Sequence, residues 1–296
     1  MDASLFTYQY PEELVAQHPL PRREDSRMIV LNRQTDSWLH QGFSDFTQYI
    51  REGDLLILNN AEADLVERDG KKIPPLPPYI RRIDPSDFTE EDFQRYRTVY
   101  ASVPGSKAAP TAGFHLTEEI LGRLAQKGTE IRFLTLHVNY DTFKPIRSQK
   151  LDQHPMHGEE YLIPPETIEA VIKAKAEKRR VVAVGTTVVR ALESWAGIAP
   201  LPWLQRPPVL PPLNLRRGDP VSEKSLGGRY ETSLFITPGF QFQIVDALLT
   251  NFHRPRSTVL VMVSAFAGRE FILSAYKEVV HQGYRLFSYG DCMLIL

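Results

Sequence analysis

The sequence predicts an α/β protein in which strands and helices alternate along most of the chain. Two observations carry this prediction. Short apolar runs bounded by glycine or asparagine are typical of buried strands. Several of them are followed by segments whose apolar residues return every three or four positions, as on one face of a helix. This alternation favours an α/β sheet or a barrel-like arrangement.

The first half of the chain supplies three of these elements. Residues 54–59 (DLLILN) form a short apolar run that predicts a buried strand. Residues 117–127 predict a helix, because Thr117 can cap its start, two glutamates lie in its first turn and Gly128 follows its end. Residues 130–138 (EIRFLTLHV) are apolar on both faces, so they predict an interior strand.

The second half continues the alternation. In chain order we expect a helix at 165–178, a strand at 180–185, a helix at 188–196, strands at 240–244 and 258–266, and a helix at 269–282. The strand at 240–244 is predicted from the alternation in FQFQI, and the strand at 258–266 from the unbroken apolar run TVLVMVSAF.

Two segments interrupt the pattern. Residues 61–97 are polar with a proline-rich centre, and residues 197–230 are rich in proline with little periodicity. Connections of this length are uncommon inside a compact domain. The second one is either a functional flap or partly disordered.

Composition places the chain among ordinary globular proteins. Of its 296 residues, 42% are hydrophobic and 24% are charged, and the formal net charge is -1. This balance allows a sizeable core in one large or two smaller domains. A net charge near zero means that any contact with nucleic acid needs a local basic patch.

The single cysteine, Cys292, excludes an internal disulfide and a cysteine-based zinc site, and we expect it to be packed rather than nucleophilic. The sequence shows no signal peptide and no run of the roughly 20 apolar residues that a membrane span needs. We therefore expect a cytoplasmic protein with no membrane contact. A monomer is expected because no sustained heptads argue otherwise.

A strand-to-helix turn is the first candidate site. Gly185, Thr186 and Thr187 lie where a predicted strand leads into a helix, so free N–H groups and two hydroxyls face outward at the positive helix end. The turn predicts a site for a carboxylate or phosphate, although the same threonines would also serve only as a cap. Arg190, one turn further, lies among apolar neighbours.

The loop AAPTAGFHLTEE, residues 108–119, is the second candidate site. Small residues around Thr111 and Gly113 let the backbone approach a flat ligand closely. We expect His115 to stand at the mouth of such a site, while a histidine before a helix is also often a cap.

The polar stretch TNFHRPRST, residues 250–258, is the third candidate site, because it separates two apolar runs. Asn251 and His253 offer hydrogen bonds, Ser257 offers a hydroxyl, and Arg256 offers a permanent charge. We expect this stretch to form the rim of a ligand pocket.

Four further positions carry chemistry with an open interpretation. His137 is either a hydrogen-bonded core histidine or a functional one. His154 and His157 stand near two glutamates, but their spacing is not tied to a helix, so no metal site is predicted. In FSYGD, Asp291 is either a base or a turn residue.

Ten motifs, taken in order, resemble the S-adenosylmethionine:tRNA ribosyltransferase-isomerase family of queuosine biosynthesis, and they span nearly the whole chain. They are YPEELVAQHPLPRREDSRMIVLNR, GDLLILNN, PLPPYI, RYRTVYA, APTAGFHLTEE, TLHV, HPMHGEEY, VGTTVVRALES, DALLTNFHRPRSTVLVMVSAFAGRE and YRLFSYGDCMLI.

This resemblance implies an activity. The ribosyl part of S-adenosylmethionine is transferred to the aminomethyl group of a 7-deazaguanine base at the tRNA wobble position and isomerised. Epoxyqueuosine forms, and adenine and methionine leave. S-adenosylmethionine is a co-substrate, tRNA carrying the precursor base is the partner, and no metal or other cofactor is required. The implied fold is a barrel-like main α/β domain of mixed strands and helices with a small inserted β-barrel.

Under this resemblance the candidate residues acquire roles. The candidates for acid or base are His115, His137, His253 and Asp291. The candidates for substrate binding are Thr111, Gly113, Gly185, Thr186, Thr187, Arg190, Asn251, Arg256, Ser257 and Tyr289. Arg254 stands where the family commonly has leucine, so Arg256 is favoured for tRNA phosphate.

The sequence also departs from the family. The inserted β-barrel would fall between LILNN and PLPPYI, but only a short stretch separates them. We therefore expect a main catalytic domain at 1–60 and 74–296 and a remnant of the insert at 61–73. The run Asn139-Tyr140-Asp141 replaces the family's Gly-Leu-Gly. These departures motivate an alternative, a divergent paralogue that binds tRNA or an S-adenosylmethionine-like ligand without turnover.

Overall fold

The computed structural model describes residues 1–139, 144–199 and 228–296. Two predictions fall partly or wholly on the remaining residues. Tyr140 and Asp141, which replace family residues, lie outside the described ranges. So does most of the proline-rich segment at 197–230.

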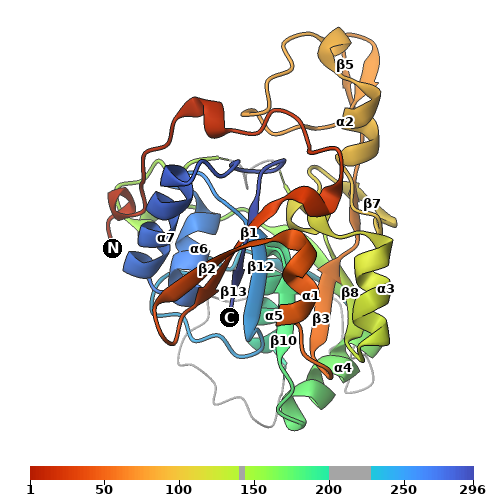
Figure 1. The fold of residues 1–296 in the computed structure, drawn as a ribbon, viewed down its shortest axis with the longest axis vertical. Coiled ribbons are helices and arrows are strands. Elements are labelled where there is room, and N and C mark those ends of the chain that lie inside the picture. The colour runs from red at the N-terminus through yellow and green to blue at the C-terminus, as the bar shows by residue number, and fades with distance from the viewer. Residues whose placement is uncertain (140–143, 200–227) are drawn as a thin grey trace.

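A mixed nine-stranded sheet runs through the centre of the molecule (Figure 1), in the order β11-β9-β8-β3-β10-β12-β13-β1-β2. The strands are β1 (Arg27–Asn32), β2 (Ser37–Gly42), β3 (Leu55–Asn59), β8 (Glu130–Leu136), β9 (Glu159–Ile163), β10 (Val181–Val184), β11 (Gly228–Thr232), β12 (Ala247–Asn251) and β13 (Cys292–Ile295). The central strands β8, β3, β10 and β12 are parallel. The order begins at β11 and ends at β2, so the expected barrel-like closure is wrong and the protein has a large open mixed sheet.

Helices cover both faces of this sheet. The chain forms α1 (Phe46–Tyr49), α3 (Glu118–Gln126), α4 (Pro165–Ala176), α5 (Thr186–Ala196), α6 (Thr258–Ala267) and α7 (Arg269–His281). Alternate residues of β3 belong to two cores: Leu55 and Ile57 pack with α4 to α7, whereas Leu56 and Leu58 pack with α1 and α3. Because both faces are buried, this strand reads as a continuous apolar run.

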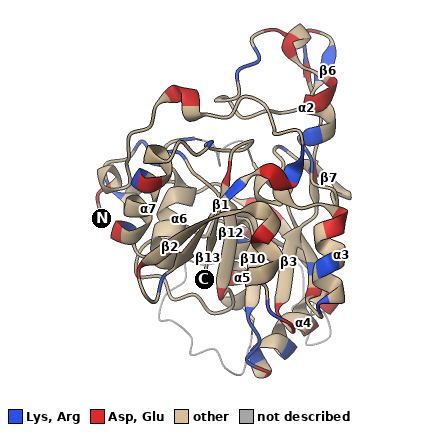
Figure 2. Ribbon diagram, viewed as in Figure 1, with Lys and Arg blue, Asp and Glu red and all other residues tan. Residues whose placement is uncertain are grey.

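The segment at 61–97 folds into a small excursion that projects from the main body (Figure 1). It contains β4 (Ala61–Ala63), β5 (Val66–Arg68), β6 (Lys71–Ile73) and α2 (Glu90–Arg95), and β4 pairs with β7 (Val103–Ser106). A third core that includes Ile80, Tyr96 and Tyr289 anchors it. Acidic and basic residues are interspersed along the excursion and along α3 and α4 (Figure 2).

Short 3-10 helices complete the described chain. They are η1 (Ala3–Leu5), η2 (Glu12–Leu14), η3 (Arg23–Asp25), η4 (Phe43–Asp45), η5 (Pro85–Asp87), η6 (Thr111–His115) and η8 (Leu151–Gln153).

Two predicted strands are wrong. Residues 240–244 form no strand, and residues 258–266 form the helix α6. Ser257 caps this helix, since its hydroxyl accepts a hydrogen bond from the main-chain N–H of Leu260 at 3.1 Å. Most residues of α6 are buried, so its sequence lacks the polar stripe that reveals a surface helix.

Helices α6 and α7 meet at Gly268, whose φ of 91° suits glycine. Among the described residues, no single helix is long and apolar enough to cross a membrane. The two helices pass by length and composition only as a pair bent by 114°. Their main apolar side chains are buried in the core.

Candidate active site

A cleft lies where the central parallel strands end. From β3 the chain passes through α3 on one face to β8, whereas from β10 it passes through α5 on the opposite face before reaching β12. The connections therefore diverge between β3 and β10. In open α/β sheets, ligands bind outside the carboxyl ends of the strands at such a switch point.

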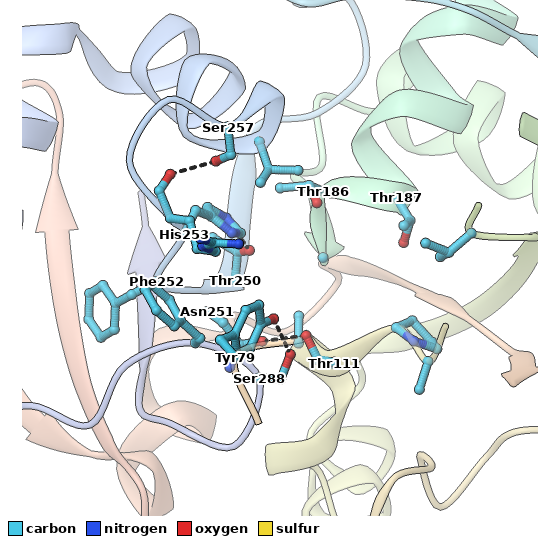
Figure 3. Close-up of a pocket in the computed structure, with 18 of the residues that line it drawn as sticks. Tyr79, Thr111, Thr186, Thr187, Thr250, Asn251, Phe252, His253, Ser257 and Ser288 are labelled. Carbon is cyan, nitrogen blue, oxygen red and sulfur yellow. Dashed lines mark hydrogen bonds between the residues drawn. The ribbon is translucent and has the colours of Figure 1, made fainter. Parts of the chain in front are cut away.

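The cleft encloses about 770 Å³, including open solvent at its mouth (Figure 3). It brings together residues from several stretches that are far apart in sequence, including all three candidate sites. The sequence-predicted residues that line it are Thr111, Gly185, Thr186, Thr187, Asn251, His253 and Ser257. The expected rim at 250–258 thus does line a pocket.

The predicted strand-to-helix turn is confirmed. Gly185 has a φ of 94°, which lets β10 turn directly into α5 at Thr186. The hydroxyl of Thr187 accepts a hydrogen bond from Asn59 at 3.2 Å, so this threonine is oriented by the end of β3 rather than used as a cap. The first N–H groups of α5 have no partner within the helix and lie at the cleft wall.

His253 is half-buried and held from several sides. Its ring Nε2 lies 3.1 Å from the Thr250 hydroxyl, its main-chain N–H donates to Tyr276 at 3.0 Å, and its carbonyl accepts from Tyr8 at 2.7 Å. Loss of solvent lowers the pKa of His253 to about 3. The cleft therefore contains a neutral imidazole in a fixed orientation.

His115 does not stand at the mouth, so that expectation is wrong. Only 3% of the residue is exposed, because η6 turns its ring inward against Phe43. The ring nitrogens bond Ser26 at 2.9 Å and Asn251 at 3.0 Å. Burial, with smaller contributions from Arg23 and Arg285, lowers the pKa of His115 to about 3.

The other two acid-base candidates lie outside the cleft lining. His137 follows the end of β8 and packs against Gly105, and partial burial lowers its pKa. Asp291 is buried and accepts main-chain N–H groups of Arg27 and Arg285, each at 2.8 Å. This geometry supports the turn interpretation of Asp291. Burial raises its pKa.

Four substrate-binding candidates also lie outside this lining, namely Gly113, Tyr289, Arg256 and Arg190. Gly113 packs against Tyr100 so closely that an added Cβ would lie 2.0 Å from its hydroxyl. Tyr289 belongs to the third core. Arg256 has a φ of 55°, and its main chain bonds Phe6 and Ile146, each at 2.7 Å.

Arg190 is buried in a neighbouring chamber. Its guanidinium pairs with Glu159 and donates to the carbonyl of Thr232 at 3.3 Å. Thr186, Thr187 and Val259 line both this chamber and the cleft. Arg190 thus contacts a carboxylate of the protein in a chamber beside the cleft.

Sequence reasoning assigned no role to several lining residues. Tyr79 donates to or accepts from Ser288 at 2.7 Å, packs on Phe287 with ring centroids 5.0 Å apart, and lies 5.8 Å below the Arg254 guanidinium. The sequence feature that could have pointed to Tyr79 is the PLPPYI motif, which contains it. For Phe287 and Ser288 that feature is the FSYGD motif, which begins with them.

His154 and His157 line a further pocket together with Pro145 and Arg147. Across the residues that the structure describes, no group of three or more His, Cys, Asp or Glu side chains is placed to hold a metal ion.

Comparison with known proteins identifies relatives that match the whole chain. The family model described as "Queuosine biosynthesis protein" matches residues 3–73 and 62–295. The S-adenosylmethionine:tRNA ribosyltransferase-isomerase of Syntrophotalea carbinolica is 38% identical over 372 aligned residues, and that of Thermotoga maritima is 35% identical over 366. Both alignments cover 100% of this chain and of the relative.

A solved structure agrees with these relatives. The crystal structure of S-adenosylmethionine tRNA ribosyltransferase from Thermotoga maritima matches with a TM-score of 0.65 and 31% sequence identity. The match covers 99% of this chain and 100% of that one.

Proposed function

The chain belongs to the queuosine biosynthesis family of S-adenosylmethionine:tRNA ribosyltransferase-isomerases, and from this premise we propose that the cleft at β10 and β12 is its active site. The reaction transfers and isomerises the ribosyl moiety of S-adenosylmethionine onto a 7-aminomethyl-7-deazaguanine base at the tRNA wobble position. Its products are epoxyqueuosine-tRNA, adenine and methionine.

The observation that carries the proposal is the position of His253 opposite the start of α5 in one cleft. The sulfonium acidifies the adjacent ribose carbon, so the reaction needs a base there, and the departing adenine needs a hydrogen bond or a proton. The tRNA amine must be held close and neutral, since proximity supplies much of the rate. The neutral imidazole of His253 supplies this cleft with a group that can accept a proton or take part in a hydrogen bond.

We assign the methionine carboxylate to the N–H groups at Thr186 and Thr187, where a helix N-terminus favours an anion. His253 is then the residue that accepts or relays a proton near the reacting carbon. The preference between the two arginines is reversed, because Arg254 lines the cleft beside Tyr79 whereas Arg256 does not. Arg254 is therefore our candidate for a tRNA phosphate.

We also propose that residues 61–73 are the remnant of an inserted β-barrel domain. The two stretches matched by the family model overlap at 62–73. The alignment with the Syntrophotalea protein spans 372 positions, whereas this chain has 296 residues. Both facts support an interruption in this region, where the structure has the short strand β4 and the hairpin of β5 and β6.

The experiment is incubation with precursor tRNA and S-adenosylmethionine, followed by mass spectrometry of the wobble nucleoside and measurement of released adenine. We expect epoxyqueuosine, and a fall in kcat of about a hundredfold or more for His253→Ala. His281→Ala is the matched control, because His281 is exposed at the end of α7. Full turnover by His253→Ala would remove that residue from the mechanism, and intact tRNA without epoxyqueuosine would refute the activity.

A further inference from the structure

A line of hydrogen-bonded side chains runs from the protein interior to the cleft. Ser26 contacts the Nδ1 atom of His115 at 2.9 Å, and Nε2 of His115 lies 3.0 Å from Nδ2 of Asn251. The hydroxyl of Thr111 lies 3.1 Å from Oδ1 of Asn251 and borders the cleft (Figure 3). Ser26, His115 and Asn251 are buried, which limits the access of water to these contacts.

Two main-chain carbonyls indicate which atom donates in each of these hydrogen bonds, because a carbonyl oxygen can only accept. At the inner end, the Ser26 hydroxyl donates to the carbonyl of Arg23 at 3.2 Å. It must then accept from His115, which places the imidazole proton on Nδ1 and leaves Nε2 as an acceptor.

The second carbonyl belongs to Asp291 and lies 3.5 Å from Nδ2 of Asn251. With the amide in this orientation, Nδ2 donates to Nε2 of His115 and Oδ1 accepts from Thr111. The opposite orientation would place two oxygens against each other at the Asp291 carbonyl. Both carbonyls therefore favour the same direction of hydrogen-bond donation.

The consequence concerns Thr111. Its one hydroxyl proton is used by Asn251, so only lone pairs remain to face the cleft. We infer that Thr111 presents a hydrogen-bond acceptor to the substrate, and that an N–H or O–H donor of the bound substrate occupies this position. The inference rests on the proposed function, since it takes this cleft as the substrate site.

His115 acts through Asn251 and is a positioning residue rather than a catalytic one. A doubly protonated ring would donate from Nε2 and would turn the Asn251 amide around. Burial opposes that state, because it lowers the pKa of His115 to about 3. The Thr111 hydroxyl then disfavours a ligand that places an acceptor beside it, since no proton would lie between the hydroxyl oxygen and the ligand acceptor.

The direction is tested without any substrate. Long-range proton–nitrogen correlation spectra of protein with ¹⁵N-labelled histidine report which ring nitrogen carries the proton. We expect His115 to be the Nδ1–H tautomer near pH 7. Its signals are assigned from their loss in His115→Gln or, if that variant does not fold, from their shift in Ser26→Ala. An Nε2–H tautomer or a charged ring would overturn the inference whatever the activity of the enzyme.

The recognition step is tested with Thr111→Val, which keeps the shape but removes the acceptor, and with Thr111→Ser, which keeps the hydroxyl. We expect Thr111→Val to raise one KM by about tenfold, the value of one lost hydrogen bond, and Thr111→Ser to restore it. A rise in the KM of S-adenosylmethionine places the donor on that molecule, and a rise in the KM of tRNA places it on the tRNA. Unchanged KM values for both substrates in folded Thr111→Val would refute the acceptor role.

The two hypotheses fail separately. Wild-type protein that shows no turnover would refute the proposed function, whereas the tautomer of His115 would still be measured.

Discussion

Arg190 and Glu159 form an ion pair in which only 6% and 4% of the two residues is exposed. The pair joins α5, the helix that begins at the cleft, to β9 near one edge of the sheet. Each partner has a further contact: Arg190 donates to the carbonyl of Thr232, and Glu159 accepts the main-chain N–H of Asn139 at 3.0 Å. The helix and the outer strands are thus linked through one buried pair of charges.

Removing one member of this pair leaves the other buried without its partner. We expect Arg190→Ala to lower the free energy of unfolding by about 3–5 kcal/mol. The double variant Arg190→Met with Glu159→Leu should recover much of that loss, because it buries no charge. Urea denaturation checks both. A decrease of less than about 1 kcal/mol in the free energy of unfolding of Arg190→Ala would contradict a stabilising buried ion pair.

Glu193 makes a second buried connection from α5. Its carboxylate accepts the main-chain N–H groups of Gln243, Ile244 and Val245 at 2.8, 3.0 and 2.9 Å. Glu193→Gln places an amide donor against one of these donors, so we expect a loss of about 2–3 kcal/mol in the free energy of unfolding. Glu169→Gln, on the exposed side of α4, is the matched control and should change stability by less than about 0.5 kcal/mol. Equal stabilities of the two variants would argue against the role of Glu193.

Gly185 occupies a backbone conformation, φ 94° and ψ 151°, that other residues rarely adopt. We expect Gly185→Ala to destabilise the protein by about 1–3 kcal/mol and to raise the KM of S-adenosylmethionine. Gly122→Ala is the comparison, because Gly122 lies inside α3 with nothing within 4 Å of an added Cβ. That change should stabilise the protein by about 0.5–1 kcal/mol. Thermal denaturation measures both effects, and a shift of Tm in the same direction for both variants would contradict the requirement for glycine at position 185.

The buried histidines make stability depend on pH. The pKa of His115 falls from 6.5 to about 3 on folding, so between these values the unfolded chain binds a proton that the folded protein does not. The contribution of His115 to the free energy of unfolding is fully present above about pH 6.5. It decreases as the pH falls toward 3, by up to about 1.4 kcal/mol per pH unit. His253 contributes in the same direction.

Urea denaturation at about pH 7 and about pH 5 measures this slope. In His115→Gln the slope should decrease by about one proton, while the exposed control His281→Ala should retain the wild-type slope. Identical slopes in His115→Gln and the wild type would show that His115 is already charged or already exposed in the folded state.

The sequence was most informative where local signals agreed. Thr117, the glutamates after it and Gly128 predicted α3 within a residue of its observed bounds, since caps and charges act within one turn. The run GTT after VVAV predicted the turn at the cleft, because a strand that ends in glycine and leads into an amphipathic segment has few other conformations. Signals of this kind need no knowledge of distant residues.

Prediction from local sequence patterns was wrong for α6, because most of its residues are buried. TVLVMVSAF contains β-branched residues and no polar stripe, and therefore reads as a buried strand, yet it is a helix packed between α5, α7 and the sheet. Hydrophobic periodicity reveals a helix only when one face is exposed to solvent and the other is buried. A helix with almost no exposed face lacks this periodicity.

By itself, the sequence determined the alternation of strands and helices, the family, and the residue types that line the cleft. Only the tertiary structure decided which of those residues meet there. His115 and Asn251 are separated by 136 positions along the chain, and their contact depends on β12 and η6 lying side by side. The order of strands in a sheet is set by the packing of the whole chain, so no local pattern could show that His115 faces inward while His253 faces the cleft.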